Sequence, residues 1–503
     1  MRNRRCKVQA IGLYLLMALV VGAGVAQGAE PRMTMWGTPP RQKPHFTKGA
    51  EGFPPLPLPV TPQRRTEKKR PPAPPLLIAN LSRFSFDGWL GSPGAVDQLL
   101  QNARRNLNLW YGWEQLDIQT VVREFNSNLQ HKTPILYLCA LYPLNLTQDQ
   151  RQALAAYVLN GGTLLINCCG QDAAFQSARE ELARMFPHYE LRRLPPDHPL
   201  YTANYRITAV HYLAPAPGIA PGNTHAGETV GLPRLEAVTI GTRAAVIVSR
   251  EDLACGWNQW NNPAVARVTP EDSTKLGLNI MTYVTAEMRF AKFLSHTQEV
   301  AGPTIRPREQ LVLAQLVHNG NWDPNPSAVP LFLKDLASNT SIAVSFDRKV
   351  LELKDPTIFS YPLLYLTGTW DPRFSKEEVA ILRRYLTTGG TLIADAAAGR
   401  VEFDIAFRKL CRTMFPDAPL KVLPPGHPIY TCFYHMTSAH VNLEKGPVQP
   451  QIEAVMINGR AAILYSKLGL SDGWAQVFSV YARSYDSADA IKLGTNMVVY
   501  AMQ

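Results

Sequence analysis

Beyond its first thirty residues the 503-residue chain has no long hydrophobic run, which excludes a protein that crosses a membrane many times. It has no Gly-rich phosphate loop, no Ser/His/Asp order typical of hydrolases and no Cys/His spacing typical of zinc sites. We therefore expect no cofactor and no metal. With 46% hydrophobic residues the chain is not wholly disordered, and its length predicts about two to four globular domains.

A basic cluster on the folded part is missing as well, although the formal net charge is +11. Residues 1–7 contribute +4, residues 31–75 contribute +7 and Glu30 contributes −1, which leaves +1 for residues 76–503. A protein that neutralises many phosphates needs clustered Lys and Arg on its folded surface. The charge distribution therefore argues against nucleic acid as a partner.

Residues 1–29 have the three parts of a secretory signal peptide. A basic start precedes the apolar run Ile11–Val21, and small residues follow up to Ala26. The alternative is an uncleaved membrane anchor, because the uncharged stretch is at the short limit for spanning a bilayer. We expect an exported protein, periplasmic or secreted, with N-terminal membrane anchoring as the alternative.

Residues 30–75 form a basic segment in which 13 of the 45 positions from 31 to 75 are Pro. Proline cannot donate a backbone hydrogen bond, so the segment is predicted to be a disordered or extended linker that is dispensable for folding. The basic run at residues 64–70 has two interpretations. It is a solvated part of the linker, or it makes peripheral contact with an anionic surface of the cell envelope.

The rest of the chain is a tandem repeat of two long segments. Four blocks recur in the same order: Gly161-Gly162-Thr163 as Gly389-Gly390-Thr391, Pro195-Pro196-Asp197-His198-Pro199 as Pro424-Pro425-Gly426-His427-Pro428, Arg243-Ala244-Ala245 as Arg460-Ala461-Ala462, and Lys275-Leu276-Gly277 as Lys492-Leu493-Gly494. The offset is 228–229 for the first two blocks and 217 for the last two, which predicts an insertion within residues 213–231. We expect domains at residues 76–290 and 309–503, joined by a linker at 291–308.

Each copy alternates strand and helix patterns. In the second copy Ser375 and Glu378 have the spacing of a capping box, which predicts a helix from Ser375 to Leu386. The other predicted elements are strands at 311–316, 362–367 and 391–394 and a helix at 328–338 capped by Ser327. In the first copy the strands at 134–139 and 163–166 match those at 362–367 and 391–394, and the helix at 147–159 matches the one from Ser375 to Leu386. This alternation predicts an α/β fold with a parallel sheet covered by helices on both faces.

Several blocks of the second copy resemble the DUF4159 family, whose domains have no known function: YPLLYLTG, FSKEEVAILRRYLTTGGTLIADAAAG, FRKLCRTMFPD and LPPGHPIY. The resemblance covers residues 311–503 and, more loosely, 76–290 through NGGTLLINCCG and LPPDHPLY. It implies two tandem domains with the flavodoxin-like α/β fold of class I glutamine amidotransferases. It implies no activity, because none is established for that family.

Cys168 is the catalytic candidate that this resemblance suggests. In amidotransferase-like folds a nucleophile lies in the tight turn between a strand and a helix, and the strand at 163–166 leads into Asn167-Cys168-Cys169-Gly170. His198 is a candidate base, and His211 lies in the same copy, but neither has a spacing that identifies it. The resulting hypothesis is a thiol hydrolase or amidase in the first domain and a degenerate second domain.

Two departures weaken that hypothesis. Ile166 stands where the turn of such enzymes begins with Gly, and the second copy has Ala396 and Ala397 at the positions of the two cysteines. Cys168 can equally be an inert buried thiol or a disulfide partner. It ends a strand near the one that Cys139 ends, but the pairing of the six cysteines after the signal stays open.

Polar and aromatic residues in loops form a set of ligand-binding candidates: Trp322, Asp323, His427, Asp87 and Trp89. The two histidines framed by prolines, His198 and His427, either face the carboxyl ends of the strands, where open α/β sheets bind ligands, or hold a turn by bonding its backbone. The Trp and Asp residues follow the first predicted strand of each copy. They suit a polar ligand or a sugar, and they suit helix capping equally well.

The leading functional hypothesis is a non-catalytic, exported tandem module that binds a small ligand or an envelope protein. It depends on the signal, the linker, the duplication and the expectation that the two copies share no polar constellation. The thiol-enzyme alternative requires a histidine that a carboxylate orients, within hydrogen-bond reach of the Cys168 sulfur.

Overall fold

The computed structural model describes residues 75–82, 94–124, 129–215, 227–259, 262–293, 310–477 and 479–503. Pro72–Gln503 form one compact unit, to which both copies of the repeat belong. The predicted signal, the basic run at 64–70 and nearly all of the Pro-rich segment lie outside the described residues. In the described part of the chain no helix is long and apolar enough to span a membrane.

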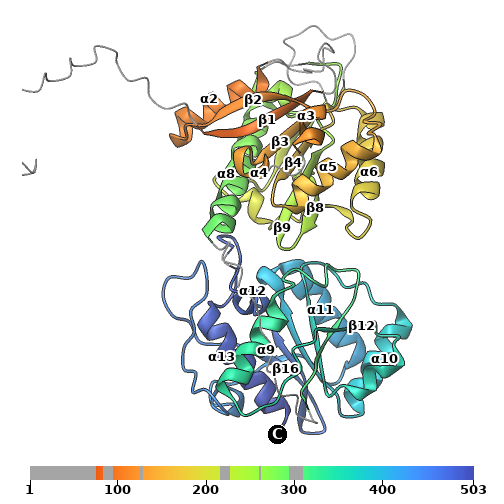
Figure 1. Ribbon diagram of the computed structural model, residues 1–503, viewed down its shortest axis with the longest axis vertical. Helices are drawn as coiled ribbons and strands as arrows, with labels where there is room; N and C mark the ends of the chain where they lie inside the picture. Colours follow the sequence, from red (N-terminus) through yellow and green to blue (C-terminus); the bar gives the residue numbers. More distant parts are fainter. Residues whose placement is uncertain are drawn as a thin grey trace, which may run out of the picture. The chain divides into compact units, whose positions relative to one another are not determined.

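The first domain is built on a seven-stranded sheet with the order β2-β1-β3-β4-β9-β8-β5 (Figure 1). Its strands, in this order, are β2 (Gly112–Asp117), β1 (Leu76–Ser82), β3 (Ile135–Cys139), β4 (Thr163–Asn167), β9 (Arg243–Ser249), β8 (Glu236–Ile240) and β5 (Leu191–Arg193). The first five strands pair in parallel, and the last two pairings are antiparallel. The five parallel strands have the 2-1-3-4-5 order of flavodoxin-like sheets.

The second domain repeats this sheet with the order β12-β11-β13-β14-β17-β16-β15. Its strands, in this order, are β12 (Lys349–Leu351), β11 (Leu313–Leu316), β13 (Leu363–Gly368), β14 (Thr391–Ala396), β17 (Arg460–Ser466), β16 (Glu453–Ile457) and β15 (Lys421–Val422). The same two pairings at the β15 edge are antiparallel. The predicted α/β fold in two tandem domains is therefore confirmed, with a mixed edge that the apolar runs did not indicate.

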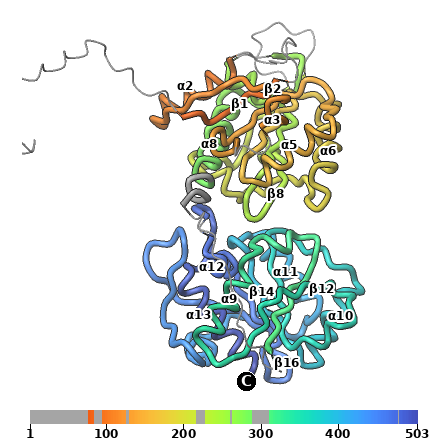
Figure 2. The backbone as a smooth tube through the Cα atoms, viewed as in Figure 1, coloured from red at the N-terminus to blue at the C-terminus, as the bar shows by residue number. Residues whose placement is uncertain are grey.

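Helices cover both faces of each sheet, as predicted (Figures 1 and 2). Those of the first domain are α2 (Ala95–Leu107), α3 (Ile118–Arg123), α4 (Leu129–Lys132), α5 (Gln148–Leu159), α6 (Asp172–Met185), α7 (Ala254–Trp257) and α8 (Pro270–Phe293), with the one-turn helix η1 (Pro199–Tyr201). Those of the second are α9 (Ala328–Asn339), α10 (Lys376–Thr387), α11 (Val401–Met414), α12 (Ser471–Trp474) and α13 (Ser487–Ala501), with η2 (Pro356–Ser360), η3 (Ala397–Gly399) and η4 (Pro428–Tyr430).

Each sheet separates two hydrophobic cores because successive strand side chains point to opposite faces. In the first domain Tyr137 and Leu165 pack with α2, α7 and α8, whereas Leu136 and Leu164 pack with α3, α5 and α6. The second domain has the same two cores, one with α9, α12 and α13 and the other with α10 and α11. Continuous apolar strands are the consequence of this two-sided burial.

Local sequence signals account for several helix ends. Thr147 and Ser375 each close the capping box that begins α5 and α10. The predicted Ser327 cap is wrong, because Ser327 already has helical backbone angles and its side chain makes no cap hydrogen bond. The backbone N–H of Ala328 instead donates to the Asn325 carbonyl at 3.0 Å, so a backbone turn begins α9.

The repeat alignment places matching tryptophans in matching contacts. Trp257 ends α7 and donates its indole N–H to the Ser273 carbonyl, and Trp474 ends α12 and donates to the Ala490 carbonyl, both at 2.9 Å. The first domain has an extra sheet of β10 (Arg267–Val268), β6 (Val210–Leu213) and β7 (Glu228–Gly231). β6 ends where the predicted insertion begins, and β7 lies within it.

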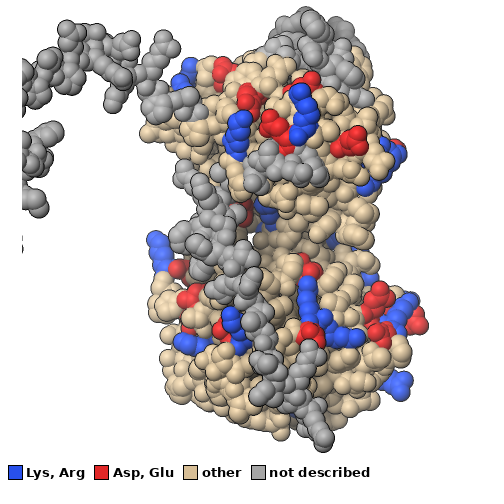
Figure 3. All heavy atoms as spheres, viewed as in Figure 1, with Lys and Arg blue, Asp and Glu red and all other residues tan. Residues whose placement is uncertain are grey.

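Charged side chains of both signs are interspersed on the face drawn in Figure 3, over both domains. This mixture agrees with the near-neutral sum for residues 76–503.

Candidate functional site

The predicted nucleophile Cys168 is a buried core residue. It follows β4 directly, packs among the apolar side chains beneath α5 and α6, and is 0% exposed. Burial is the main cause that raises its pKa to about 12, and Cys139 and Glu236 add to the rise. No histidine is among the groups that act on it in the described part of the chain. A protonated, enclosed thiol is a poor nucleophile.

The sharp turn after β4 is centred on the next residue. Cys169 and Gly170 have φ of 50° and 70°, and Ala398 and Gly399 have φ of 54° and 63° in the second domain. A Cβ on Gly170 would meet the Ala266 carbonyl oxygen at 2.3 Å, so this position needs glycine for space as well as for its backbone angle. The turn is thus shared by both domains, and the side chain that it presents in the first domain is that of Cys169.

The two proline-framed histidines hold turns. His198 and His427 precede η1 and η4, and their Nδ1 atoms accept hydrogen bonds from the backbone N–H of Leu200 and Ile429, each at 3.2 Å. Burial lowers the pKa of His198 well below its usual value, so its ring is neutral. These contacts are those of the turn-holding interpretation, and among the described residues no hydrogen bond joins His198 to Cys168.

Trp322 and Asp323 are organised by an arginine of the same domain. The Arg348 guanidinium contacts the Asp323 carboxylate and lies 5.3 Å from the centre of the Trp322 ring. It also donates to the Gln315 side-chain oxygen at 3.0 Å, and the Gln315 amide donates to the Trp322 carbonyl at 2.8 Å. The sequence counterparts Asp87 and Trp89 lie outside the described residues.

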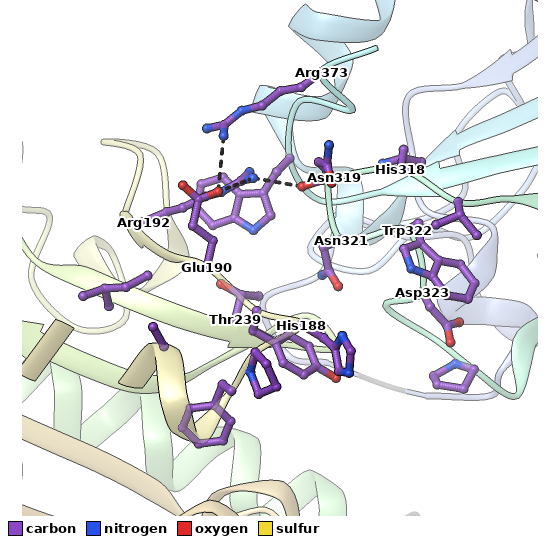
Figure 4. Close-up of a pocket in the computed structure, with 18 of the residues that line it drawn as sticks. His188, Glu190, Arg192, Thr239, His318, Asn319, Asn321, Trp322, Asp323 and Arg373 are labelled. Carbon is purple, nitrogen blue, oxygen red and sulfur yellow. Dashed lines mark hydrogen bonds and ion pairs between the residues drawn. The ribbon is translucent and has the colours of Figure 1, made fainter. Parts of the chain in front are cut away.

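Trp322 and Asp323 nevertheless line a pocket of about 830 Å³ (Figure 4). The first domain contributes polar residues from the chain around β5 and from β8, and the second contributes the loop after β11 and Arg373. The labelled lining residues are His188, Glu190, Arg192, Thr239, His318, Asn319, Asn321, Trp322, Asp323 and Arg373. Two of the predicted ligand-binding residues therefore belong to a polar cavity.

Arg192 is the least satisfied group of this pocket. Its side chain is only 11% exposed. The Nε atom donates to the Glu190 carboxylate at 2.9 Å and Nη2 donates to the Asn319 carbonyl at 2.9 Å, while Nη1 is buried without a hydrogen-bond partner among the described residues. The Thr239 hydroxyl in the same lining is likewise buried without a partner in the described part of the chain.

Unpartnered buried polar atoms are costly and uncommon, so each one needs an explanation. Three buried side-chain atoms lack a partner among the described residues, and two of them, on Arg192 and Thr239, line this pocket. The sequence did not single out either residue. The available signal was the basic residue that recurs at this place, Arg192 in the first copy and Lys421 in the second, at the offset of 229.

His318 closes the pocket wall as a neutral ring. Its Nε2 hydrogen bonds with the Thr367 carbonyl at 2.8 Å, and its Nδ1 accepts from the Gly320 N–H at 2.9 Å. Burial lowers the pKa of His318 to about 4. Both ring nitrogens are occupied by backbone groups, so this histidine shapes the wall.

The family model of DUF4159, a domain of unknown function, matches residues 86–285 and 312–502. The chain belongs to the DUF4159 family. No curated protein matches the chain. A crystal structure of a protein described as ThuA-like, from Bacteroides uniformis, is 10% identical over 44% of this chain and 95% of its own length, with a TM-score of 0.21. A TM-score of that size carries no argument about fold or function.

The two DUF4159 domains share a His–Asp pair that the sequence analysis did not expect. His211 Nδ1 lies 2.7 Å from the Asp272 carboxylate, and His440 Nδ1 lies 3.1 Å from that of Asp489. In both domains the same carboxylate oxygen also accepts the backbone N–H of the histidine. The expectation that the copies share no polar constellation is therefore wrong. The histidines follow the offset of 229 and the aspartates that of 217, so only the completed alignment pairs them.

The surroundings of the two pairs differ. In the second DUF4159 domain Asp486 joins the pair, and His440, Asp486 and Asp489 offer ligand atoms within 4.8 Å of one another, which is compatible with a metal ion. The first domain has Thr269 at the place of Asp486, and its His211 lines a separate pocket of about 650 Å³. The expectation of no metal stays a prediction.

Proposed function

We propose that this chain is a non-catalytic binding protein of the cell envelope, and that its two DUF4159 domains hold a small anionic ligand in the pocket of Figure 4. The observation that carries the proposal is the pair of buried polar atoms without a partner, Arg192 Nη1 and Thr239 Oγ1, in one pocket lining. Both atoms are enclosed in the free protein, so a ligand oxygen would reach them once the side chains of the lining move apart. The charge of an arginine strengthens its hydrogen bonds to carboxylates, and Nη1 is the nitrogen of Arg192 that has no partner among the described residues.

The charges around the pocket support an anion. Arg179, Arg192 and Arg373 line it, and the Glu190 carboxylate there already accepts from both Arg192 and Arg373. The Asp323 carboxylate is engaged by Arg348. Aromatic surface from Trp322 and the amides of Asn319 and Asn321 would suit hydroxyl groups. A sugar acid or a small hydroxycarboxylate is therefore the ligand class that we propose.

Catalysis is disfavoured by the state of the candidate groups. Cys168 is enclosed with a raised pKa, and Nδ1 of His198, the candidate base, accepts the backbone N–H of Leu200. The carboxylate-oriented His211 makes no hydrogen bond to Cys168 in the described part of the chain. The alternative, a thiol hydrolase or amidase, would gain support if iodoacetamide modified Cys168 selectively at neutral pH in the folded protein.

Export is part of the proposal and depends on the sequence of residues 1–29. We infer a cleaved signal and a periplasmic or secreted product, with an uncleaved anchor as the alternative. N-terminal sequencing of the protein from its native cell distinguishes the two, because a cleaved chain begins after Ala26 or Gly28.

The binding test compares an anionic sugar with its neutral counterpart. Isothermal titration of the full chain should detect galacturonate or citrate, and should detect galactose more weakly or not at all. Arg192→Gln should lower the affinity for the anion by about 10- to 100-fold, as expected for loss of a charged hydrogen bond. Arg206→Gln removes an exposed arginine of the same domain outside the lining and should have no effect.

Thr239→Val adds a test that separates binding from folding. It removes an unsatisfied buried hydroxyl with little change of shape, so the free protein should be as stable as the wild type or more stable. The affinity for the anion should nevertheless fall by about 2- to 10-fold. Equal binding of galactose and galacturonate, or no response of affinity to either substitution, would contradict the proposed site.

A further inference from the structure

Two buried thiols of the first DUF4159 domain meet at the carboxyl end of the sheet. Cys139 ends β3, and Cys169 lies in the turn after β4, whose register pairs Asn167 with Cys139. Their Sγ atoms are 2.7 Å apart. Non-bonded heavy atoms pack at roughly 3.5–4.0 Å, and a disulfide bond is about 2.05 Å long. The two sulfurs are therefore closer than two separate thiols pack.

We propose that Cys139 and Cys169 form a disulfide in the folded protein, which ties the end of β3 to the turn after β4. The link would close a loop between residues 30 positions apart in the chain. It would also hold the left-handed backbone of Cys169, whose φ is 50°. This inference is independent of the proposed ligand pocket.

The neighbouring cysteines are excluded as partners by their positions. Cys168 points to the opposite face of the sheet, because it packs in the core of α5 and α6, whereas Cys139 and Cys169 belong to the core of α2, α7 and α8. Cys255 is also buried, but its thiol hydrogen bonds with the Asp252 carboxylate. The residue close to Cys139 is therefore Cys169 and not Cys168, as the sequence had suggested. A shift of one residue moves a side chain to the opposite face of a sheet.

The second DUF4159 domain shows that this fold does not need the two thiols. The register that pairs Cys139 with Asn167 recurs as Thr367 with Asp395, so threonine replaces Cys139. The left-handed turn residue that matches Cys169 is Ala398, one residue beyond the Ala397 that the sequence predicted. The pair is therefore an addition to a turn that is already stable without it, and the second domain supplies the substitutions for a controlled test.

The oxidation requires a disulfide-bearing small molecule, of which glutathione disulfide is an example. One cysteine thiolate attacks that disulfide, forms a mixed disulfide and releases one thiolate of the small molecule. The second cysteine then attacks the sulfur of its partner and releases the other. The protein loses two hydrogens as two protons and two electrons, and the small molecule is reduced to two thiols. Both cysteines are buried in the folded domain, so the exchange belongs to the folding stage.

The test uses the full chain refolded in a glutathione redox buffer, with free thiols alkylated after denaturation. Trypsin should release residues 133–151 linked to residues 152–179, with a mass about 2 Da below that of the two peptides in which Cys139 and Cys169 are reduced and Cys168 is alkylated. The linked species should persist in Cys168→Ala and disappear in Cys169→Ala and Cys139→Thr. Reduction of the disulfide should lower the melting temperature of the first domain in the wild-type chain by roughly 5–10 °C. The same treatment should not change the melting temperature of Cys169→Ala.

Fragmentation of the linked peptides from the unaltered chain provides a measurement that does not depend on variants. Fragment ions must place the link on Cys169, because Cys168 lies in the same peptide. A link to Cys168 or to Cys255, or complete alkylation of all cysteines after oxidative refolding, would overturn the proposal.

Discussion

The two domains satisfy the same strand end with different chemistry. In the second domain β14 carries Asp395, whose carboxylate accepts from the Tyr365 hydroxyl at 2.6 Å and from the backbone N–H groups of Leu470 and Ser471 at 2.8 and 3.1 Å. In the first domain β4 ends in Asn167. Its amide oxygen accepts from the Leu253 N–H at 3.2 Å.

The amide of Asn167 brings a donor that the carboxylate of Asp395 lacks. Asn167 Nδ2 donates to the Asp252 carboxylate at 2.8 Å and lies 3.3 Å from the Tyr137 hydroxyl. In the first domain the carboxylate therefore belongs to Asp252, in the loop after β9, and the amide oxygen of Asn167 accepts the N–H of Leu253. Both domains thus place a side-chain oxygen at the end of this strand to accept a loop N–H. The charge of that side chain, and the presence of cysteines beside it, differ between the domains.

The largest expected effect comes from removing the acceptor in the second domain. Asp395→Leu should lower the free energy of unfolding by about 3–5 kcal/mol, because two buried N–H groups lose their acceptor at roughly 1–3 kcal/mol each. Asp395→Asn copies the first domain and should cost less than about 1.5 kcal/mol. Chemical denaturation of the full chain measures both, and equal losses would contradict the requirement for an acceptor.

The stabilities of the wild type and of Asp395→Asn should depend differently on pH. Burial raises the pKa of Asp395, so its folded form binds a proton more tightly than its unfolded form does. The wild type therefore loses stability as the pH rises from the ordinary value of the carboxyl group through the raised one. Asp395→Asn lacks this slope, so its stability relative to the wild type should increase as the pH rises above the ordinary carboxyl value of about 4.

The next effect in size concerns His318, which belongs to a loop of the second domain. Its pKa is lowered from 6.5 to about 4, so its contribution to stability is complete above pH 6.5 and is lost as the pH falls to about 4. The loss should reach about 3 kcal/mol. His318→Gln should flatten this part of the stability profile, whereas His435→Gln, at an exposed position, should not. Parallel profiles for all three proteins would disprove the assignment.

The parts of the fold that local sequence determines were predictable. The capping residues Thr147 and Ser375, the Gly-Gly pairs after their helices and the apolar strands all act within a few residues, so a single sequence reveals them. The duplication, found by recurring blocks, predicted two matching domains before any contact was known.

The site depends on contacts between distant segments, and the sequence does not reveal these. Arg192 is notable only because one of its nitrogens is buried without a partner in the described residues, which no local pattern indicates. His211 meets Asp272 across 61 positions, and Cys139 meets Cys169 because the turn reverses one residue later than the pattern suggested. Prediction at these places requires knowing which face each side chain takes.

A medium effect is expected at the two capping boxes, which should be equivalent. Thr147→Ala and Ser375→Ala each remove the side-chain oxygen that accepts the N–H of the third helical residue, at 3.3 Å in both domains. Each should cost about 1 kcal/mol of stability. Thr147→Ser and Ser375→Thr exchange the caps and should cost a few tenths of that. If the two alanine variants differ by more than about 1 kcal/mol in their loss of unfolding free energy, the capping boxes do not stabilise the two domains equally.

The smallest effect concerns the residue that distinguishes the two His–Asp pairs. Asp486 caps α13 by accepting the Asp489 N–H at 2.8 Å, and the first domain has Thr269 at this place. Threonine caps helices almost as well as aspartate, so Asp486→Thr should change the free energy of unfolding by less than about 0.5 kcal/mol, while Asp486→Ala should cost about 1 kcal/mol. If Asp486 instead serves a metal with His440 and Asp489, Zn²⁺ should raise the melting temperature of the wild type and not that of Asp486→Thr. An unchanged melting temperature of both proteins with Zn²⁺ is the result that we expect, because the carboxylates already accept the N–H groups of Asp489 and His440.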